Sequence, residues 1–384
     1  MCLRPFNFRY FDYHPAPSTE SVSSKTHGLI PVWGFGTVVA STHPRIQAGE
    51  RVYGYLAPTR YLVVPVSPSD VNKYAFFIPR PHLPAGKASL IIASSISTDL
   101  RVPSDRRPYN QITRCASDPQ YNPSPAIEDL TMLYRPLFWT SYWCEDWLFS
   151  SQYRGTKRVL ISSASSKTAF CLAYLIKKRV SRGEISGIQI IGLTSKRNLT
   201  FTRGLSLYDE VLDYESFTSA SALSPILGTE AWLYVDVAGS GSLNKRVSSH
   251  LDSRLTASIA LGLTNLSPSS LDASSIKWST NAFTADSAAS SRSPATLEQF
   301  FMPEWLAVRR HQLSIEQITS LQNQAWKDMM DDCGNWVKMV HVFGGSGVKV
   351  AYEDVVQGGL GPDTGLIWSM WEKDHRNSDF PSRL

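Results

Sequence analysis

Residues Arg158 to Arg179 read RVLISSASSKTAFCLAYLIKKR, and this stretch decides the fold of the second half of the chain. It begins with the apolar run Val159 to Ile161 and continues through small polar residues from Ser162 to Thr168. From Ala169 to Lys178 apolar residues recur at helical spacing. The order of apolar strand, short turn and amphipathic helix predicts the opening of a βαβ unit.

The turn of this unit carries hydroxyl groups and a lysine. A helix N-terminus has unpaired N–H groups and the positive end of the helix dipole, so it is a natural seat for an anion. A lysine in the first turn opposes that dipole, which makes an anionic partner more plausible. We therefore interpret the turn as a seat for the phosphates of a dinucleotide. The predicted contacts are Ser163, Ser165, Ser166, Lys167 and Thr168.

Two familiar phosphate-binding motifs are missing from the turn. Serines stand where the glycines of GxGxxG would let the backbone approach a pyrophosphate. The turn also lacks the glycines that precede Gly-Lys-Ser/Thr in a P-loop. An ordinary strand-to-helix turn, in which a serine or threonine caps the helix, explains the same residues. The residues leave both interpretations open.

The bulk composition describes a globular chain with room for two domains. Its 384 residues, 42% hydrophobic and 11% aromatic, can bury a sizeable core. The net charge of +5 comes without a Lys/Arg block, so we expect no nucleic-acid partner. The five cysteines lie far apart without a CxxC pair, which argues against a metal site and a disulfide framework. No apolar run approaches the roughly 20 residues that span a bilayer, and prolines interrupt the N-terminus. We expect no membrane contact, no signal peptide and a cytoplasmic location.

Strands and helices alternate from residue 157 to about 265, which predicts a parallel α/β domain. Strands are predicted at 187–194, 210–214, 231–237 and 257–263. Ser195, Lys196 and Arg197 directly follow strand 187–194, where the adenosine ribose lies in a doubly wound sheet. Hydroxyl and cationic groups suit a 2′-phosphate, so these residues favour NADP over NAD. Gly239, in the turn after strand 231–237, is predicted to lie at the same ligand edge.

The flanking segments have a different character. Short strands with turn signals are predicted at 31–40, 50–55 and 60–66, which indicates a β-rich first domain. An aromatic helix is predicted at 128–149, and residues 86–105 and 265–295 are interpreted as loop excursions. The elements predicted near the C-terminus are a helical region at about 304–333, strand 336–343, turn 344–347, helix 352–357 and strand 365–370.

The GERVYG turn, the VVPV strand end and the segment DEVLDY resemble medium-chain dehydrogenases/reductases of the quinone-oxidoreductase type. A closer resemblance is to an uncharacterised bacterial and fungal family related to those reductases. It is carried by PVWGFGTVVAS, GERVYGY, YNQITRC, RPLFWTSYW and, most specifically, SSASSKTA. The resemblance implies an α/β fold class with a GroES-like β-rich domain (1–150 and 331–384) and a Rossmann-type domain (151–330) built on a doubly wound parallel sheet.

Two segments depart from the pattern of that family. The N-terminus looks shortened or altered before PVWGF, and residues 86–105 have no counterpart. An imperfect gene model with a retained intron would explain the insert. A spliced message that lacks this stretch would confirm that hypothesis.

The resemblance also implies a function. The zinc ligands of zinc-dependent relatives are absent at matching places, so we expect a zinc-independent, NADPH-dependent reductase. Its substrate would be a small apolar molecule with a carbonyl or an activated alkene. Tyr53, Tyr55 and Thr140 are the catalytic candidates, because the cleft of zinc-free relatives runs between these regions. The alternative is a reductase-like scaffold without hydride transfer, which catalyses a dehydration or C–C cleavage or serves as a binding protein. Whether the protein forms a homodimer is left open.

Overall fold

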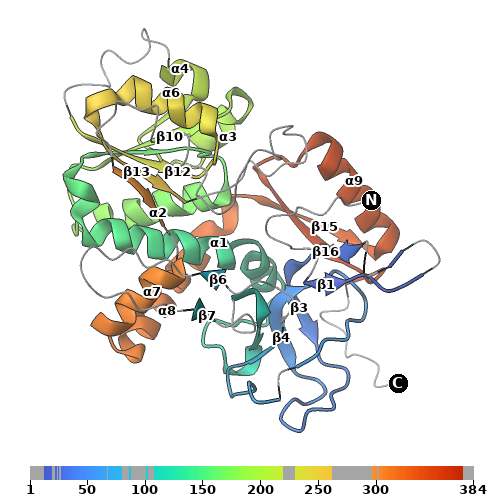
Figure 1. The fold of residues 1–384 in the computed structure, drawn as a ribbon. Helices are drawn as coiled ribbons and strands as arrows, with labels where there is room; N and C mark the ends of the chain where they lie inside the picture. Colours follow the sequence, from blue (N-terminus) through green and yellow to red (C-terminus); the bar gives the residue numbers. More distant parts are fainter. Residues whose placement is uncertain are drawn as a thin grey trace. The chain divides into compact units, whose positions relative to one another are not determined.

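The computed structural model describes residues 13–19, 22–23, 25, 27–66, 68–79, 86–87, 101–102, 108–218, 230–261, 296–300 and 302–374. The chain forms two compact units, drawn in Figure 1. Residues 134–314 are called the α/β unit, and residues 1–133 together with 315–384 are called the β-rich unit. The domain boundaries predicted from the sequence are 150/151 and 330/331. The two compact units divide at 133/134, inside helix α1 (Pro125–Ser150), and at 314/315.

Six parallel strands form the sheet of the α/β unit, in the spatial order β11-β10-β9-β12-β13-β14. They are β9 (Arg158–Ile161), β10 (Gln189–Thr194), β11 (Glu210–Asp213), β12 (Trp232–Asp236), β13 (Leu255–Ala260) and β14 (Thr296–Gln299). Counted from β9, this is the strand order 3-2-1-4-5-6 of a Rossmann fold, with its topological switch point between β9 and β12. The predicted doubly wound parallel sheet is therefore confirmed.

Helices cover both faces of this sheet, with α6 over one face and α2 over the other (Figure 1). Among the described residues of the unit, the helical segments besides α1 are η4 (Gln152–Gly155), α2 (Lys167–Ser181), η5 (Lys196–Asn198), α3 (Leu199–Gly204), α4 (Tyr214–Thr218), α6 (Gly241–Leu251), η6 (Asp252–Arg254) and α7 (Met302–Gln312). Every residue from Ala169 to Ile176 on α2 is buried. On the other face, α6 packs Leu243, Val247 and Leu251 into the core. The central strands are rich in apolar residues because they are buried on both faces.

The β-rich unit contains a small antiparallel sheet in the order β3-β4-β8-β5, as the β-rich prediction requires. Its first elements are β1 (His14–Pro15), β2 (Gly28–Leu29), β3 (Val32–Thr37), β4 (Arg51–Leu56), β5 (Ala75–Phe77), β6 (Gly86–Lys87), β7 (Arg101–Val102), η2 (Pro108–Asn110), β8 (Gln111–Arg114) and η3 (Cys115–Ser117). Its C-terminal elements are α8 (Ile315–Asp332), η7 (Cys333–Asn335), β15 (Lys338–Phe343), α9 (Gly344–Gly358) and β16 (Thr364–Ser369). Aliphatic residues such as Val52 and Ile112 form the core on one face of the sheet. The strands β15 and β16 pair in parallel, and α9 connects them.

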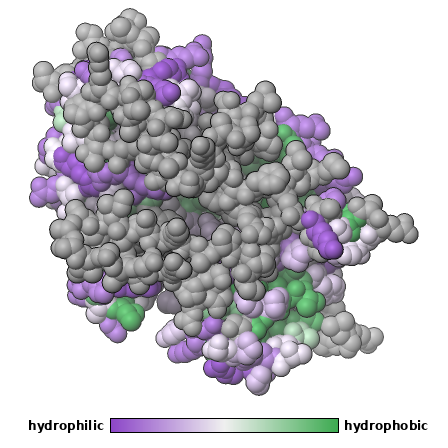
Figure 2. Space-filling view, in the orientation of Figure 1, coloured by the Kyte–Doolittle hydropathy of each residue, from purple (hydrophilic) through white to green (hydrophobic). Residues whose placement is uncertain are grey.

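The strand predicted at 60–66 is wrong. No residue from 60 to 66 belongs to a strand. Arg60 instead binds the Met370 carbonyl (2.9 Å) and the Glu372 carboxylate (2.7 Å) through its guanidinium. Side chains hold this segment in place of a strand ladder, and Tyr61 and Val63 are 63% and 97% exposed. Figure 2 shows a hydrophobic (green) area on the described surface of the β-rich unit.

Two predictions near the C-terminus also need correction. The glycine-rich segment 344–347 is not a separate turn but the first turn of α9. Gly344 makes this entry possible, because its φ of +74° lies in the left-handed region that side chains disfavour. The helical region predicted at 304–333 consists of two helices, α7 and α8, which are separated at residues 313–314. Residues 265–295 and most of 86–105 lie outside the described residues.

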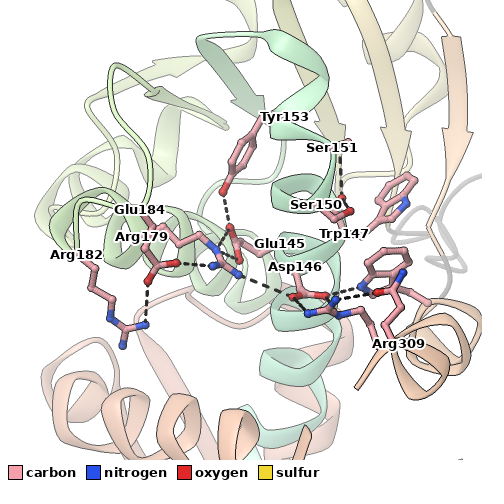
Figure 3. A network of polar contacts seen from close by, with 12 residues as sticks. Glu145, Asp146, Trp147, Ser150, Ser151, Tyr153, Arg179, Arg182, Glu184 and Arg309 are labelled. Carbon is pink, nitrogen blue, oxygen red and sulfur yellow. Dashed lines mark hydrogen bonds and ion pairs between the residues drawn. The ribbon is translucent and has the colours of Figure 1, made fainter. Parts of the chain in front are cut away.

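A buried polar network ties together the elements that precede and flank β9 (Figure 3). Glu145 of α1 is 1% exposed and accepts hydrogen bonds from Arg179 of α2 and from the Tyr153 hydroxyl. Its neighbour Asp146 accepts the indole N–H of Trp305 (2.7 Å) and pairs with Arg309 (3.0 Å) on α7. Burial raises the pKa of Glu145, while Arg179 and Tyr153 act in the opposite direction. The network fixes α1, α2 and α7 against one another.

The same network stabilises a left-handed turn at η4. Gln152, Tyr153, Arg154 and Gly155 have φ values of 51°, 50°, 57° and 72°. Each non-glycine residue in this conformation costs about 1–2 kcal/mol, so the turn needs compensating contacts. The Tyr153–Glu145 hydrogen bond supplies one, and the Arg154–Glu298 ion pair (2.7 Å) supplies another. The turn therefore delivers the chain into β9 in a fixed direction.

We expect Arg179→Ala to destabilise the protein by about 3–5 kcal/mol, because it leaves the buried Glu145 carboxylate without its cation. Arg182→Ala is the matched control. Arg182 is half exposed and lies 3.8 Å from Glu184, so its loss should change stability by about 1 kcal/mol or less. Urea unfolding of both variants measures the difference. If the two variants have equal free energies of unfolding, Arg179 is not needed to stabilise the buried Glu145 carboxylate.

Candidate functional site

The candidate site lies at the topological switch point, where the chain leaves the carboxyl ends of β9 and β12. In an open α/β sheet the connections after the two strands go to opposite faces at this point, and the crevice between them leaves room for a ligand. The turn after β9 runs from Ser162 to Ser166, and the turn after β12 runs from Val237 to Ser240. Both turns lead directly into helices, α2 and α6, whose N-termini therefore lie at the same edge of the sheet.

A hydrogen-bonded pair, Ser162 and Asp236, joins the two turns. The Ser162 hydroxyl donates to Asp236 Oδ1 (2.9 Å). It also accepts the backbone N–H groups of Val237 (2.9 Å) and Ala238 (3.0 Å). Both side chains are fully buried, so these hydrogen bonds are shielded from water. The pair holds the carboxyl ends of the two central strands at a fixed separation.

The Asp236 carboxylate has partners on each oxygen. Gly239 N–H donates to Oδ1 (2.9 Å), and the Asn244 amide of α6 donates to Oδ2 (2.8 Å). The Tyr234 hydroxyl in turn donates to Asn244 Oδ1 (2.8 Å). Burial raises the pKa of Asp236, and the hydrogen bonds from Asn244, Gly239 and Ser162 counteract part of that shift. The turn after β12 is thereby shaped around a buried carboxylate.

The turn after β9 reaches its conformation without glycine. Ser163 takes the left-handed conformation (φ +52°) and donates its backbone N–H to the Tyr214 hydroxyl (3.2 Å). Ala164 N–H donates to the Leu193 carbonyl (2.8 Å) of β10, and its own carbonyl accepts the Tyr208 hydroxyl (2.9 Å). The glycine that permits this contact lies on β10. A Cβ at Gly192 would stand 2.9 Å from both Ala164 Cβ and the Tyr208 ring.

The first turn of α2 offers N–H groups for an anion. Ser166 caps the helix by accepting Ala169 N–H (3.4 Å), as the serine-cap interpretation predicts. Among the residues that the structure describes, the backbone N–H groups of Ser165 and Thr168 have no acceptor. Lys167, at the first helical position, adds a positive charge to the same turn. The serine-cap interpretation is therefore confirmed, and the phosphate-binding interpretation stays a prediction.

The predicted cofactor residues occupy several different positions in this structure. The Ser165 hydroxyl is turned inward and accepts hydrogen bonds from Thr194 (3.1 Å) and Asn198 (3.0 Å). Ser195 directly follows β10, and its buried hydroxyl has no partner among the described residues. Lys196 and Arg197 are exposed on η5. Gly239 has a φ of +64° and points its N–H at Asp236 rather than away from the sheet.

The catalytic candidates divide between the two units. Thr140 lies on the part of α1 that belongs to the α/β unit, and its hydroxyl donates to the Pro136 carbonyl (3.0 Å). The next residue, Ser141, is fully buried and donates to the Thr168 carbonyl (2.8 Å) in the first turn of α2. The chain thus brings the Thr140 region of α1 to the candidate phosphate seat.

Tyr53 and Tyr55 belong to the β-rich unit and lie on one face of β4, opposite the aliphatic core. They pack in an aromatic cluster in which Tyr53 stacks on Trp33 (5.6 Å between ring centroids) and Tyr55 contacts Tyr109 (5.1 Å). Burial raises the pKa of the Tyr55 hydroxyl. Their catalytic role remains a prediction.

Sequence reasoning did not single out four residues that build the site. Ser162, Asp236, Tyr214 and Asn198 act through contacts 33 to 74 positions apart in the chain. A pattern within one segment cannot reveal such a pairing. The polar Asp236 at the end of the apolar run WLYVD was the available signal, since a buried carboxylate requires partners.

Among the described residues no group of three or more His, Cys, Asp or Glu side chains could hold a metal ion. Within the same part of the chain, no helix has both the length and the apolar character needed to cross a membrane.

Gly192→Ala should move the turn after β9, because the new methyl group has no space between Ala164 and Tyr208. We expect a loss of about 1–3 kcal/mol in the free energy of unfolding. Gly204→Ala is the control, since no atom lies within 4 Å of its added Cβ. Thermal and urea unfolding of both variants provide the measurement, and a Gly192→Ala protein as stable as Gly204→Ala would contradict the packing described.

The raised pKa of Asp236 predicts a pH dependence of stability. The folded protein holds the Asp236 proton more tightly than the unfolded chain does, so wild type should lose stability relative to Asp236→Asn as pH rises from about 4 through the raised pKa. Urea unfolding of both proteins at pH 4, 5, 6 and 7 gives the difference at each pH. If the stability difference between the two proteins stays constant or changes in the opposite direction, the pKa of Asp236 is not raised by burial.

Three solved structures illustrate what the chain is similar to. CurA from Vibrio vulnificus in complex with NADPH has 12% identity and a TM-score of 0.49, covering 93% of this chain and 84% of that chain. The yhdH oxidoreductase from Salmonella enterica in complex with NADP has 13% identity and a TM-score of 0.43, covering 88% and 82%. The Bacillus subtilis protein yhfP with NAD bound has 15% identity and a TM-score of 0.43, also covering 88% and 82%. At these identities residue roles do not transfer, so the candidate site depends on this chain's own residues.

No curated protein matches the sequence. A protein-family model described as "Protein of unknown function (DUF2855)" matches residues 5–361, which is nearly the whole chain. The chain therefore belongs to this family.

Proposed function

We propose that the protein binds NADPH at the switch point of its α/β unit and is a zinc-independent reductase. Its substrate would be a small apolar molecule with a carbonyl or an activated alkene. The observation that carries the proposal is the first turn of α2, where Lys167 and the free N–H groups of Ser165 and Thr168 meet at the ligand edge of a 3-2-1-4-5-6 sheet.

Charge and hydrogen bonding at this turn both favour an anion. A lysine at the N-terminus of a helix opposes the macrodipole, at a cost of about 0.3–1 kcal/mol. A phosphate offsets that cost, because it accepts the two free N–H groups and pairs with Lys167. The diphosphate of a dinucleotide supplies such a group, and the Rossmann strand order supports binding of the rest of the molecule at the same edge.

The residues after β10 support NADPH over NADH. Ser195, Lys196 and Arg197 stand where an NAD-binding Rossmann domain presents an acidic residue to the ribose 2′-hydroxyl. Two exposed cations and a hydroxyl that has no partner among the described residues are suited to a 2′-phosphate instead. A bound 2′-phosphate would satisfy the Ser195 hydroxyl, which is otherwise costly to bury.

When bound, NADPH supplies a hydride. This chain's own residues would hold its phosphates and orient it along the sheet edge. The hydroxyls of Tyr53, Tyr55 and Thr140 remain the candidates for hydrogen bonding to a substrate carbonyl. Zinc independence rests on the missing zinc ligands at the positions where zinc-dependent relatives carry them.

A second candidate function is favoured by the composition of the turn. The N–H groups of Ser163, Ala164 and Ser166 are all used inside the fold, and Ser163 carries a side chain where glycine usually admits a pyrophosphate. A turn with so few available N–H groups is what we would expect in a scaffold that has lost dinucleotide binding. It would then catalyse a cofactor-free step, such as a dehydration or C–C cleavage, or act as a binding protein.

Fluorescence titration with NADPH and NADH distinguishes the two functions. We expect wild type to bind NADPH in the micromolar range and more tightly than NADH. Lys167→Ala should weaken both nucleotides by roughly tenfold, which is about 1.4 kcal/mol for one charge-assisted hydrogen bond. Arg197→Ala should weaken NADPH but leave NADH unchanged.

Lys178→Ala is the matched control, because Lys178 lies in the last turn of the same helix. Its affinities should equal those of wild type. A folded wild-type protein that binds neither nucleotide would overturn the proposal and favour the cofactor-free scaffold.

A further inference from the structure

A histidine–carboxylate pair lies in the β-rich unit, whereas the candidate dinucleotide site belongs to the α/β unit. Nε2 of His341 on β15 is 2.6 Å from Oδ2 of Asp129 on α1. The Asp129 side chain is 5% exposed and the His341 side chain is 33% exposed. The two residues are 212 positions apart in the chain, so the fold itself creates the pair.

The packing of α1 on β15 sets this geometry. On α1, Asp129 and Leu133 are four residues apart, so they lie on one face of the helix. On β15, His341 and Met339 alternate onto the same face. A Cβ at Gly365 of β16 would meet both Leu133 and Met339 within 2.8 Å, which shows how closely the helix lies against the two strands. The imidazole is therefore held between a buried carboxylate and solvent.

The buried carboxylate determines which ring nitrogen carries the proton. An Asp129 carboxylate requires a donor, so the neutral His341 ring keeps its hydrogen on Nε2. Nδ1 then carries the lone pair, and among the described residues it has no hydrogen-bond partner. This is the arrangement in which a carboxylate orients a histidine that acts as a base through its other nitrogen.

The neighbouring carboxylate, Glu128, has partners of its own. Glu128, the neighbouring carboxylate, is bound by the Arg51 guanidinium (2.9 Å from Nε) and by the Tyr121 hydroxyl (3.0 Å). The ring of Phe343 lies nearly parallel to the imidazole, at 6.2 Å between ring centroids. The partly exposed imidazole thus has an apolar neighbour, which suits an uncharged carbon skeleton.

We propose that His341, positioned by Asp129, is a general base that transfers protons for small uncharged carbonyl compounds. For a β-hydroxy carbonyl compound, Nδ1 takes a proton from the carbon next to the carbonyl, and the C–H electron pair forms a C=C bond. The C–O bond to the β-hydroxyl breaks, and the proton on Nδ1 goes to the departing oxygen to give water. The step needs no oxidant or reductant, so it does not depend on the proposed dinucleotide site.

The test uses 4-hydroxybutan-2-one as the probe, and NMR follows its loss of water to but-3-en-2-one in the presence of the full-length protein. His341→Gln keeps an N–H that can donate to Asp129 but removes the basic nitrogen, so the fold should be retained. We expect its rate to fall by roughly 100-fold, as is typical when a general base is removed. His43→Gln is the matched control. His43 lies in the same unit and its Nε2 faces the Pro68 carbonyl rather than a carboxylate, so the rate should be unchanged.

The role of Asp129 is tested by a spectroscopic signature. Ring ¹⁵N shifts of His341 should report hydrogen on Nε2 in wild type and a mixture of the two tautomers in Asp129→Asn, with a slower reaction. The inference is overturned if wild type accelerates the reaction no more than an equal concentration of imidazole. It is equally overturned if folded His341→Gln retains the wild-type rate.

Discussion

The hydrogen bond between the buried Ser162 hydroxyl and the Asp236 carboxylate is the contact on which the candidate site depends. It connects the two strands that flank the switch point, and it arranges the turn after β12 around itself through the N–H groups of Val237, Ala238 and Gly239. A buried carboxylate without these donors would be costly, so the strand ends and the turn must form together. The shape of the ligand edge follows from that requirement.

The turn after β9 meets its steric requirements with different residues from those of a glycine-rich loop. The space for close packing comes from Gly192 on the neighbouring strand, and the left-handed position is filled by Ser163. As a result most backbone N–H groups of the turn donate to acceptors within the protein. The N–H groups left for a ligand are those of Ser165 and Thr168. An anion seated there would lie over the first turn of α2 rather than over the turn itself.

The sequence revealed the parts of this structure that depend on local pattern. The apolar strand, the serine cap at Ser166 and the alternation that gives the parallel sheet all follow from residues near one another. The strand predicted at 60–66 was wrong although its apolar residues do alternate. This segment is held by side-chain contacts such as those of Arg60, and not by the backbone hydrogen bonds of a sheet. The separate turn predicted at 344–347 was wrong because glycines usually mark a turn, whereas here Gly344, in the left-handed conformation, begins a helix.

Long-range polar pairs were beyond reach from the sequence. Ser162 with Asp236, Glu145 with Arg179, and Asp129 with His341 each join residues that only the folded chain brings together. Their residue types are common at the surface, and only burial gives them a structural or chemical role. The pattern therefore predicts an edge of the sheet for the candidate site, but the long-range hydrogen bonds within that site were not predictable.

The most direct test of the account is an amide ¹⁵N–¹H spectrum of the deuterated full-length protein during addition of NADPH. We expect the Ser165 and Thr168 amide signals to move first and furthest, because their N–H groups would donate to the phosphates. Saturating NADPH that leaves both signals in place would contradict a phosphate seat at the first turn of α2.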